Sequence, residues 1–525
     1  MASPKILSLD NKRKKLFFLC IVLVYSYLCG TMITEALSLR IRQTFRLEPT
    51  REQSQAIETF CRFVTSRTPH TTMIMRGSAG TGKTSLAGAF VKTMLQLQQK
   101  VVLMAPTGRA AKVFSQNSGY PAFTIHRKIY RQKTLTDLQS GFSLNDNMHT
   151  DTLFLVDEAS MIANGGPSGG EAFFGSGYLL DDLIQYVYSG RNCRLMLIGD
   201  KAQLPPVGEE ESPALTKGKL EEYGLLVETC DLNEVLRQSQ ESGILFNATM
   251  IRQMIEPANN RSGRFATDPP LQLPRIRFHA FADIQMVPGN ELMEQLNSSY
   301  SKVGIDETMV ITRSNKRANI YNEGIRRTIL DCEEVLNTND LLMVVKNNYY
   351  WVKPGKEEDD GQELSFIANG DRVKVLKVRN VRELYQFRFA DVLLQFPDYH
   401  DFELQTTVIL DSLTTEAPAL TPDQNELLFH EVMVDYADIP YKRDRIKKIK
   451  EDPYYNALQI KYAYAVTCHK AQGGQWAHVY LDQGYMTDDM LSPDYIHWLY
   501  TAFTRATEKL FLVNWPTSQI APDNP

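Results

Sequence analysis

The chain has 525 residues, of which 43% are hydrophobic and 23% charged, and its 57 Lys and Arg against 62 Asp and Glu give a formal net charge of −5. These values are typical of globular proteins and exclude a disordered chain, a collagen and a small disulfide scaffold. At about 100–200 residues per domain, the length predicts three or four domains. The slight acidity, taken alone, argues against a nucleic-acid partner.

The charges are unevenly distributed along the chain. Residues 59–136 contain no Asp or Glu. The same stretch holds twelve basic residues: Arg62, Arg67, Arg76, Lys83, Lys92, Lys100, Arg109, Lys112, Arg127, Lys128, Arg131 and Lys133. Chance segregation onto surface loops is one explanation, and the other is a region that faces a polyanion.

Seven cysteines lie at scattered positions, and no CxxC or Cys/His pairing has the spacing of a zinc site. Because seven is odd, a complete set of internal disulfides is impossible. Reduced cysteines and a cytoplasmic location are therefore expected.

The N-terminus carries a contrary signal. The basic residues 12–15 (KRKK) precede an apolar run at 16–30, which is the pattern of a signal peptide but short for a membrane-spanning helix. It is a signal or anchor, a buried element, or an upstream extension that is absent from the working protein, with Met32 as the alternative start. We favour the extension and assign it residues 1–45.

Apolar runs then alternate with helical patterns from residue 47 to about 240. The runs lie at 72–75, 101–105, 153–156 and 195–198, and continuous apolar runs of this length are typical of buried parallel strands. A second α/β pattern begins at Thr308, breaks off, and resumes near Tyr462. The interruption at 346–460 is rich in Val, Phe and Tyr and predicts a β-rich insertion. The fold class is α/β with parallel sheets.

The first strand runs directly into a glycine-rich loop with the pattern GxxxxGK[ST]. The glycines let successive N–H groups point inward around phosphates, and the following helix N-terminus adds positive potential. Lys83 is expected to reach the β and γ phosphates, and Thr84 to bind Mg²⁺. The predicted nucleotide-binding residues of this loop are Gly77, Ser78, Ala79, Gly80, Thr81, Gly82, Lys83, Thr84 and Ser85.

The strand at 153–156 ends in two carboxylates, Asp157 and Glu158. In parallel sheets, ligands bind at the carboxyl ends of the strands, so both acids are expected beside the phosphates. Asp157 is predicted to hold Mg²⁺ and Glu158 to activate the attacking water. Together with the loop, they predict an NTP hydrolase.

Three further residues are candidates for catalysis. Gln203, in a rigid segment before Pro205 and Pro206, could sense the γ-phosphate. Arg237 and Arg505 could stabilise transition-state charge from across a cleft, although surface salt bridges are the ordinary role of such arginines.

The complete set resembles the superfamily 1B DNA helicases, in particular the exonuclease V alpha-subunit (RecD-like) family and its Dda-type relatives. The matching segments appear in the family's order: residues 77–85 (GSAGTGKTS), 103–112 (LMAPTGRAAK), 155–160 (LVDEAS), 199–208 (GDKAQLPPVG), 232–238 (LNEVLRQ), 467–476 (TCHKAQGGQW) and 500–506 (YTAFTRA). Residues 50–56 resemble the Q motif, in which Gln53 would read the adenine edge and favour ATP. The Pif-type family shares several of these motifs but usually has Ser where this chain has Thr504.

The resemblance implies two RecA-like lobes with a small β-barrel insertion in the second, and 5′→3′ translocation on single-stranded DNA that drives duplex separation with ATP and Mg²⁺. It also implies contacts with the DNA backbone by Thr107, Arg109, Lys112, Thr124, His126, His469 and Lys470, each of which could instead be an ordinary surface or capping residue. Phe123, Tyr130 and Phe142 are candidates for base stacking or for the core.

The expected domains are the first lobe at 46–255 with a small insertion near 118–150, a linker and first part of the second lobe at 256–345, the barrel insertion at 346–460, and the rest of the second lobe at 461–525. The insertion near 118–150 could hold the strand-separating hairpin. The expected partner is single-stranded DNA and its junctions with duplex, and repair or replication proteins are further candidates. The protein is expected to be a monomer that does not associate with a membrane. An RNA or RNA–DNA helicase and a non-enzymatic DNA-binding subunit are the alternatives, but intact Lys83, Asp157, Glu158 and Arg505 argue against the second.

Overall fold

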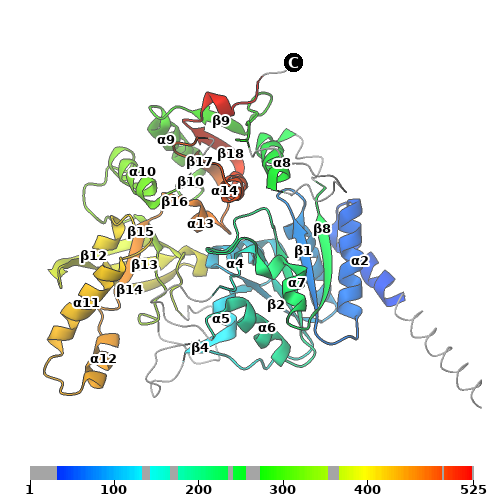
Figure 1. Ribbon diagram of the computed structural model, residues 1–525, viewed down its shortest axis with the longest axis horizontal. Coiled ribbons are helices and arrows are strands. Elements are labelled where there is room, and N and C mark those ends of the chain that lie inside the picture. Colours follow the sequence, from blue (N-terminus) through cyan, green and yellow to red (C-terminus); the bar gives the residue numbers. More distant parts are fainter. Residues whose placement is uncertain are drawn as a thin grey trace, which may run out of the picture.

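A computed structural model describes residues 32–132, 142–165, 176–234, 241–255, 272–352, 366–487 and 490–522. Three bodies are visible in Figure 1: a first lobe, a second lobe and a barrel that extends to one side. The apolar run at 16–30 lies outside the described residues. Among the described residues, no helix is both long and apolar enough to cross a membrane.

The first lobe is built on a six-stranded parallel sheet with the order β3-β2-β6-β7-β1-β8. Its strands are β1 (Thr71–Gly77), β2 (Lys100–Ala105), β3 (Ala122–Thr124), β6 (Thr152–Val156), β7 (Arg194–Gly199) and β8 (Leu226–Leu232). Its helices are α2 (Arg51–Thr65), α3 (Lys83–Gln96), α4 (Gly108–Ser118), α5 (Ile125–Ile129), α6 (Leu179–Ser189) and α7 (Lys217–Glu221). The central strands are buried on both faces, which explains why the sequence shows them as unbroken apolar runs.

Residues 32–45 form a helix that packs on this lobe. Leu37, Ile41 and Phe45 are buried in the same core cluster as Phe60 of α2 and Phe90 of α3. The first lobe therefore begins well before residue 46, because an amphipathic stripe within the assumed extension completes its core.

The second lobe has a five-stranded parallel sheet with the order β16-β10-β17-β18-β9. Its strands are β9 (Ile284–Val287), β10 (Thr308–Thr312), β16 (Ala465–Thr467), β17 (Trp476–Asp482) and β18 (Ala506–Val513), and its helices are α9 (Leu292–Val303), α10 (Asn315–Thr328), α13 (Cys468–Ala471) and α14 (Pro493–Phe503). The fold class is thus the one expected: α/β with two parallel-sheet lobes and a barrel.

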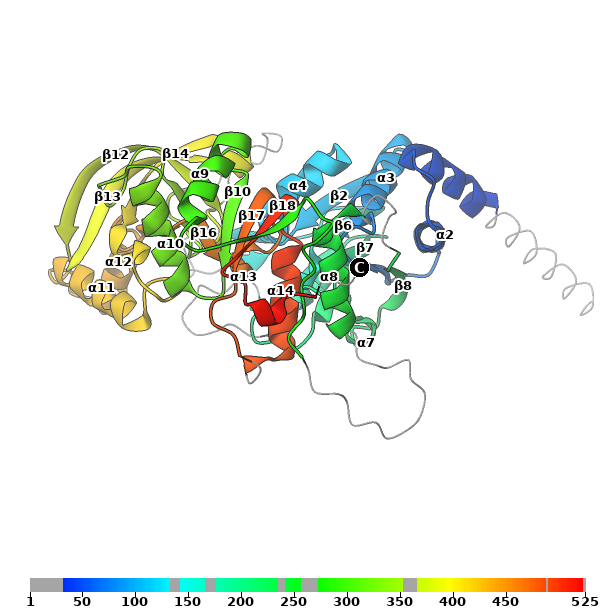
Figure 2. The same cartoon turned by 90° about the horizontal axis from the view of Figure 1, so that it is seen from above.

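Helix α8 (Gly243–Ile255) differs from its expected place in the first lobe. Ile244, Ala248 and Ile251 are buried in the core of the second lobe, and α8 lies beside α14 in Figures 1 and 2. The chain therefore crosses to the second lobe before residue 243, and the apolar face of α8 determines where it packs.

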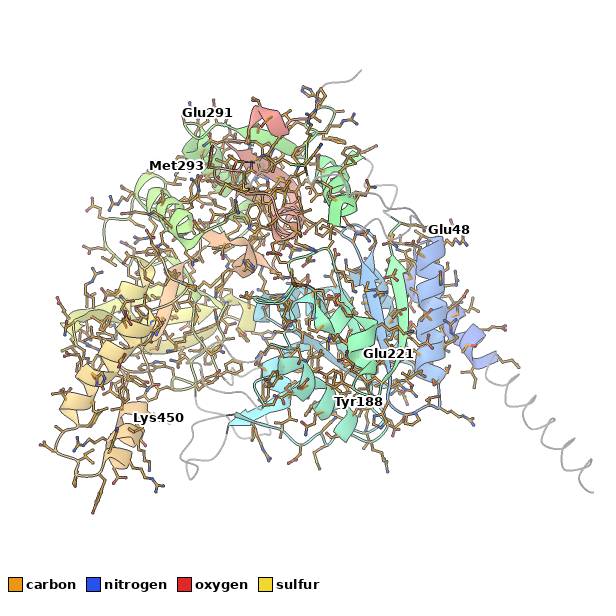
Figure 3. All side chains as sticks on the ribbon, viewed as in Figure 1. Glu48, Tyr188, Glu221, Glu291, Met293 and Lys450 are labelled. Carbon is orange, nitrogen blue, oxygen red and sulfur yellow. The ribbon has the colours of Figure 1, made fainter. Side chains whose placement is uncertain are left out.

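The barrel is closed by five strands: β11 (Leu341–Val344), β12 (Arg372–Leu384), β13 (Phe387–Phe396), β14 (Phe402–Ile409) and β15 (Leu458–Tyr462). It begins a few residues before 346 and ends just after 460, because β11 and β15 pair with each other. Its β14–β15 connection contains two helices, α11 (Pro422–Asp435) and α12 (Lys442–Lys450), that the composition did not indicate. Lys450, on this helical extension, lies at the opposite side of the molecule from Glu48 of the first lobe (Figure 3).

A two-stranded antiparallel stem, β4 (Tyr130–Gln132) with β5 (Phe142–Leu144), projects from the first lobe. It lies inside the segment 118–150 in which a strand-separating hairpin was expected. Residues 133–141, between its strands, lie outside the described residues, and the separating role stays a prediction.

Candidate nucleotide and nucleic-acid site

The phosphate loop connects β1 to α3. Gly80 and Gly82 have φ angles of 76° and 80°, a left-handed conformation that glycine adopts without steric cost. A Cβ at Gly77 would lie 2.9 Å from atoms of Leu232, Lys83 and Thr81. The Lys83 ammonium donates hydrogen bonds to the carbonyls of Gly77 at 2.6 Å and Ser78 at 2.9 Å. The lysine therefore lies folded over the loop, at the place where phosphates would bind.

Gln53 supports the loop from α2. Its side-chain amide donates to the Thr81 carbonyl at 2.9 Å, and its side-chain oxygen accepts from the backbone N–H of Thr50 in a capping box. Gln53 is 1% exposed. The glutamine therefore ties the helix start to the phosphate loop. Its role in reading adenine stays a prediction.

The two carboxylates follow β6, whose neighbours in the parallel sheet are β2 and β7. The backbone N–H of Asp157 donates to the Met104 carbonyl at 3.0 Å, and Asp157 Oδ1 accepts from the N–H of Glu158 at 2.9 Å. Burial and the nearby charge of Glu158 raise the pKa of Asp157, against the opposing effects of the Glu158 N–H and Lys83. Glu158 has a φ of 52°, which turns the chain sharply after the strand.

Two buried side-chain oxygens in this area have no hydrogen-bond partner among the described residues: Ser78 Oγ and Gln203 Oε1. Buried polar atoms are normally satisfied by a protein group, water or a ligand. The carboxylate of Asp157 and the half-buried hydroxyl of Thr84 are the hard oxygen donors that Mg²⁺ prefers. The residues present therefore fit a nucleotide with a divalent metal ion, and Ser85, one residue on, is exposed.

Arg505 lies at the corner between α14 and β18 in the second lobe and is 2% exposed. Its Nε donates to the Thr501 carbonyl, its Nη1 to the Gly474 carbonyl and its Nη2 to Thr504 Oγ1, at 3.0–3.1 Å. These bonds stay within the second lobe, so a role at the phosphates requires Arg505 to leave them. Arg237 lies outside the described residues.

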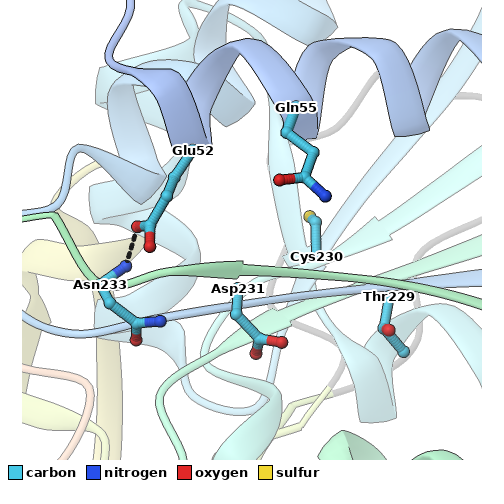
Figure 4. Close-up of a pocket in the computed structure, with 6 residues that line it drawn as sticks. All are labelled: Glu52, Gln55, Thr229, Cys230, Asp231 and Asn233. Carbon is cyan, nitrogen blue, oxygen red and sulfur yellow. Dashed lines mark hydrogen bonds between the residues drawn. The ribbon is translucent and has the colours of Figure 1, made fainter.

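A polar pocket of about 270 Å³ lies between the start of α2 and β8. Glu52 accepts a hydrogen bond there from the N–H of Asn233 (Figure 4). It also accepts one from the N–H of Glu234. This contact ties the segment that leads toward Arg237 to the helix that supports the phosphate loop.

Two predicted nucleic-acid contacts are helix caps. The Thr107 hydroxyl accepts from the N–H of Ala110 at 3.2 Å, and the Thr124 hydroxyl accepts from the N–H of Arg127 at 3.3 Å. Burial lowers the pKa of His126 to about 4, so this ring is neutral at physiological pH. These three side chains are used to build the first lobe, whereas His469 is exposed at the start of α13.

The three predicted cationic contacts, Arg109, Lys112 and Lys470, meet protein groups instead. Arg109 of α4 donates to the Gln475 carbonyl of the second lobe, and its guanidinium lies 4.5 Å from the ring centroid of Trp476. Burial lowers the pKa of Arg109 to about 10. The second lobe covers Arg109 in this structure, and its contact with the DNA backbone stays a prediction.

Lys112 and Lys470 both contact the barrel. The Lys112 ammonium donates to the Pro397 carbonyl at 2.9 Å and lies 3.4 Å from the carboxylate of Asp398, while Lys470 donates to Asn369 Oδ1. Gly108 of α4 lies so close to the barrel that a Cβ there would be 2.6 Å from the Tyr399 hydroxyl. We call this meeting of α4, the segment 469–476 and the barrel turns at 369–371 and 397–399 the three-way junction.

The aromatic candidates also differ from one another. Tyr130 donates to Asp182 at 2.7 Å and belongs to the core. Phe123 is half-buried, with Arg127 and Lys128 each 5.5 Å from its ring centroid. The side chain of Phe142 lies outside the described residues.

Sequence reasoning missed a polar network between the lobes. Tyr500 of α14 donates to Asp200 Oδ2 at 2.6 Å and accepts from the N–H of Ala79 at 3.0 Å. Tyr500 is the first residue of the segment that resembles motif VI, but no local pattern shows which group a buried tyrosine contacts.

Two domain models match the chain in the order of the lobes. The AAA domain matches residues 48–255, which contain the phosphate loop, both carboxylates and Gln203, and the UvrD-like helicase C-terminal domain matches residues 462–513, which contain Arg505.

Several proteins are similar to the chain. The uncharacterized protein R530 of Acanthamoeba polyphaga mimivirus is 24% identical over 517 residues, which cover 84% of this chain and 95% of R530. The ATP-dependent RecD2 DNA helicase of Deinococcus radiodurans is 31% identical over 181 residues, which cover 34% of this chain and 21% of RecD2. Among solved structures, Pif1 helicase from Bacteroides in complex with ADP-AlF3 and single-stranded DNA has 14% identity and a TM-score of 0.42, covering 91% of this chain and 95% of that one. Pif1 from Candida albicans has 15% identity and a TM-score of 0.37, covering 91% and 97%.

A phosphate-loop ATPase lobe followed in one chain by a UvrD-like helicase lobe defines an ATP-hydrolysing helicase. The chain carries the ordered motif set by which it resembles the superfamily 1B DNA helicases. Its ATPase lobe is one that binds a nucleotide with a divalent metal ion.

Proposed function

We propose that this protein translocates 5′→3′ along single-stranded DNA and separates duplex ahead of it, using ATP with Mg²⁺, in DNA repair, recombination or replication. One observation carries most weight: the turn after β7 begins in the first lobe, yet its side chains Ala202 and Leu204 are buried in the core of the second. A change at the phosphates of the first lobe would therefore be transmitted to the second, as a motor requires.

Within the ATP site, Lys83 and the N–H groups of the phosphate loop would bind the phosphates, and Asp157 with Thr84 would hold the metal ion, which supplies charge neutralisation. Glu158 would orient and deprotonate the attacking water. Gln203, whose buried oxygen has no protein partner among the described residues, would contact the γ-phosphate or that water. Arg505 and Arg237 would stabilise developing charge after the lobes close.

For nucleic acid, the three-way junction gathers Arg109, Lys112 and Lys470 at the meeting of both lobes and the barrel. We propose that single-stranded DNA binds along this face and replaces some of these protein contacts with phosphate contacts. Thr107, Thr124 and His126 would then act by shaping α4 and α5. A monomer in an ATP-supplied, cytoplasmic compartment is consistent with this role.

A strand-displacement assay tests activity, polarity and substrate together. The substrates are matched duplexes with a 5′ tail, a 3′ tail or no tail, each with a DNA or an RNA loading strand. We expect unwinding of the 5′-tailed DNA substrate that depends on ATP and Mg²⁺. Unwinding from the 3′ tail alone would contradict the polarity, and a preference for the RNA strand would favour the alternative substrate.

A further inference from the structure

We infer that Tyr500 is a positioning residue that couples the phosphate loop to the second lobe through Asp200. This inference rests on the proposed ATP-driven function and extends it to a residue outside the phosphate-binding, metal-binding and arginine sets. Tyr500 lies on α14 of the second lobe, whereas Ala79 and Asp200 belong to the first lobe. One hydroxyl group therefore connects two loops of the ATPase lobe with the lobe that must move.

The Tyr500 hydroxyl both accepts and donates a hydrogen bond. Its oxygen accepts from the backbone N–H of Ala79 at 3.0 Å, and its proton is donated to Asp200 Oδ2 at 2.6 Å. Tyr500 is 1% exposed and Asp200 is 3% exposed. Burial and the charge of Asp200 hold the pKa of Tyr500 well above its ordinary value, so the hydroxyl keeps its proton and can both donate and accept.

Asp200 connects Tyr500 to the turn that contains Gln203. Its other oxygen, Oδ1, accepts from the N–H of Ala202 at 3.0 Å. The same turn is held by a second side chain of α14, since Thr501 Oγ1 accepts from the N–H of Leu204 at 2.8 Å. The second lobe thus fixes both ends of the turn.

A bridge of this kind has a defined consequence for ATP turnover. Because Ala79 lies within the phosphate loop, a displacement of its N–H alters the loop, and a displacement of Asp200 is transmitted toward Gln203. Hydrogen bonds to charged groups contribute more than neutral ones, and an unpaired buried carboxylate is costly. Loss of the hydroxyl should therefore affect turnover more than nucleotide binding.

The test compares Tyr500→Phe with Tyr480→Phe. Tyr480 is also a buried tyrosine of the second lobe, but its hydroxyl contacts Gln295 and Ser299 within that lobe. In Tyr500→Phe we expect the DNA-stimulated kcat for ATP to fall about tenfold or more, with the KM for ATP and the affinity for fluorescent mant-ADP changed by less than about threefold. Tyr480→Phe should leave these values unchanged. An unchanged kcat in Tyr500→Phe, or an equal loss in both variants, would overturn the coupling.

A double-mutant cycle with Asp200→Asn completes the test on the full-length chain. If Tyr500 acts through Asp200, the double variant should show no larger loss of kcat, and no larger shift of the thermal midpoint, than the more affected single variant. Additive effects would contradict the link. The midpoint shifts need no catalytic activity, so absence of ATPase in the unmodified protein would refute the proposed function while the link to Asp200 is still decided.

Discussion

The phosphate loop and the sheet edge beside it, which we call the nucleotide edge, differ from the three-way junction in how their basic residues are paired. Lys83 at the nucleotide edge and Arg109 and Lys112 at the junction all come from the acid-free stretch 59–136. At the nucleotide edge, the Lys83 ammonium donates hydrogen bonds to two carbonyls of its own loop. The buried oxygens Ser78 Oγ and Gln203 Oε1 have no partner among the described residues. At the three-way junction, Arg109, Lys112 and Lys470 are engaged by the second lobe or the barrel.

The difference shows what a run of positive charge determines. It predicts a region that favours anions, but it does not determine whether a given cation is free. At the nucleotide edge, parallel strands bring the motif segments together within one lobe. At the junction, the partners of Arg109, Lys112 and Lys470 lie 366, 285 and 101 residues away in sequence.

The largest effect is expected from Lys83→Ala at the nucleotide edge. Removing a positioned cation that stabilises phosphate charge should lower ATPase and unwinding rates by about 100-fold or more. Single-strand binding should be largely retained, because the three-way junction is unchanged. Steady-state ATPase, strand displacement and fluorescence anisotropy with labelled single-stranded DNA measure the three properties.

Lys92→Ala is the matched control, since Lys92 is exposed on the same helix α3. It should leave all three properties near those of the unmodified protein. Retained unwinding by Lys83→Ala would break the proposed division between the two regions.

An intermediate effect on stability is expected from the titration of Asp371, in the barrel turn of the three-way junction. Burial raises the pKa of Asp371 to about 7, although the Ala368 N–H and the Tyr399 hydroxyl donate to its carboxylate. The folded protein therefore holds this proton more tightly than the unfolded chain. The resulting stabilisation is complete below about pH 4 and is lost as the pH rises through about 7, by at most about 4 kcal/mol.

Thermal midpoints of the unmodified protein and of Asp371→Asn, measured from pH 5 to pH 8, check this effect. The midpoint of the unmodified protein should fall relative to that of Asp371→Asn as the pH rises. Parallel curves would mean that the carboxyl group titrates normally and that the junction is more open in solution than in the structure.

The smallest effect is expected from the pair Lys112 and Asp398. If Lys112 also binds a DNA phosphate, Lys112→Ala should weaken single-strand binding about 3- to 10-fold and lower the slope of log affinity against log salt by about one. Asp398→Asn releases Lys112 from its partner and should leave the affinity unchanged or raise it. Equal losses in both variants would show that the pair acts by holding the barrel in place.

The two regions also differed in how well they could be predicted. Gly80, Gly82 and Lys83 lie in a motif whose backbone conformation is determined within eight residues, and the predicted strand–loop–helix is present. Asp157 follows an unbroken apolar strand, so its position at the sheet edge followed from the parallel arrangement. The motif of Gln53 did not reveal that its amide hydrogen-bonds to Thr81 and Thr50, and its role in reading adenine stays a prediction.

By itself, the sequence indicated the helicase class, the order of the lobes and a β-rich insertion, because each depends on local hydrophobic periodicity or on a short motif. The barrel was implied by the family resemblance, and the roles of the nucleotide residues stay predictions. Only the tertiary structure decided that residues 32–45 complete the first core, that α8 packs on the second lobe, that Arg109 lies over Trp476, and that Tyr500 bridges Ala79 and Asp200. Each of these depends on contacts between segments far apart in the chain, where burial and geometry, rather than residue type, select the partner.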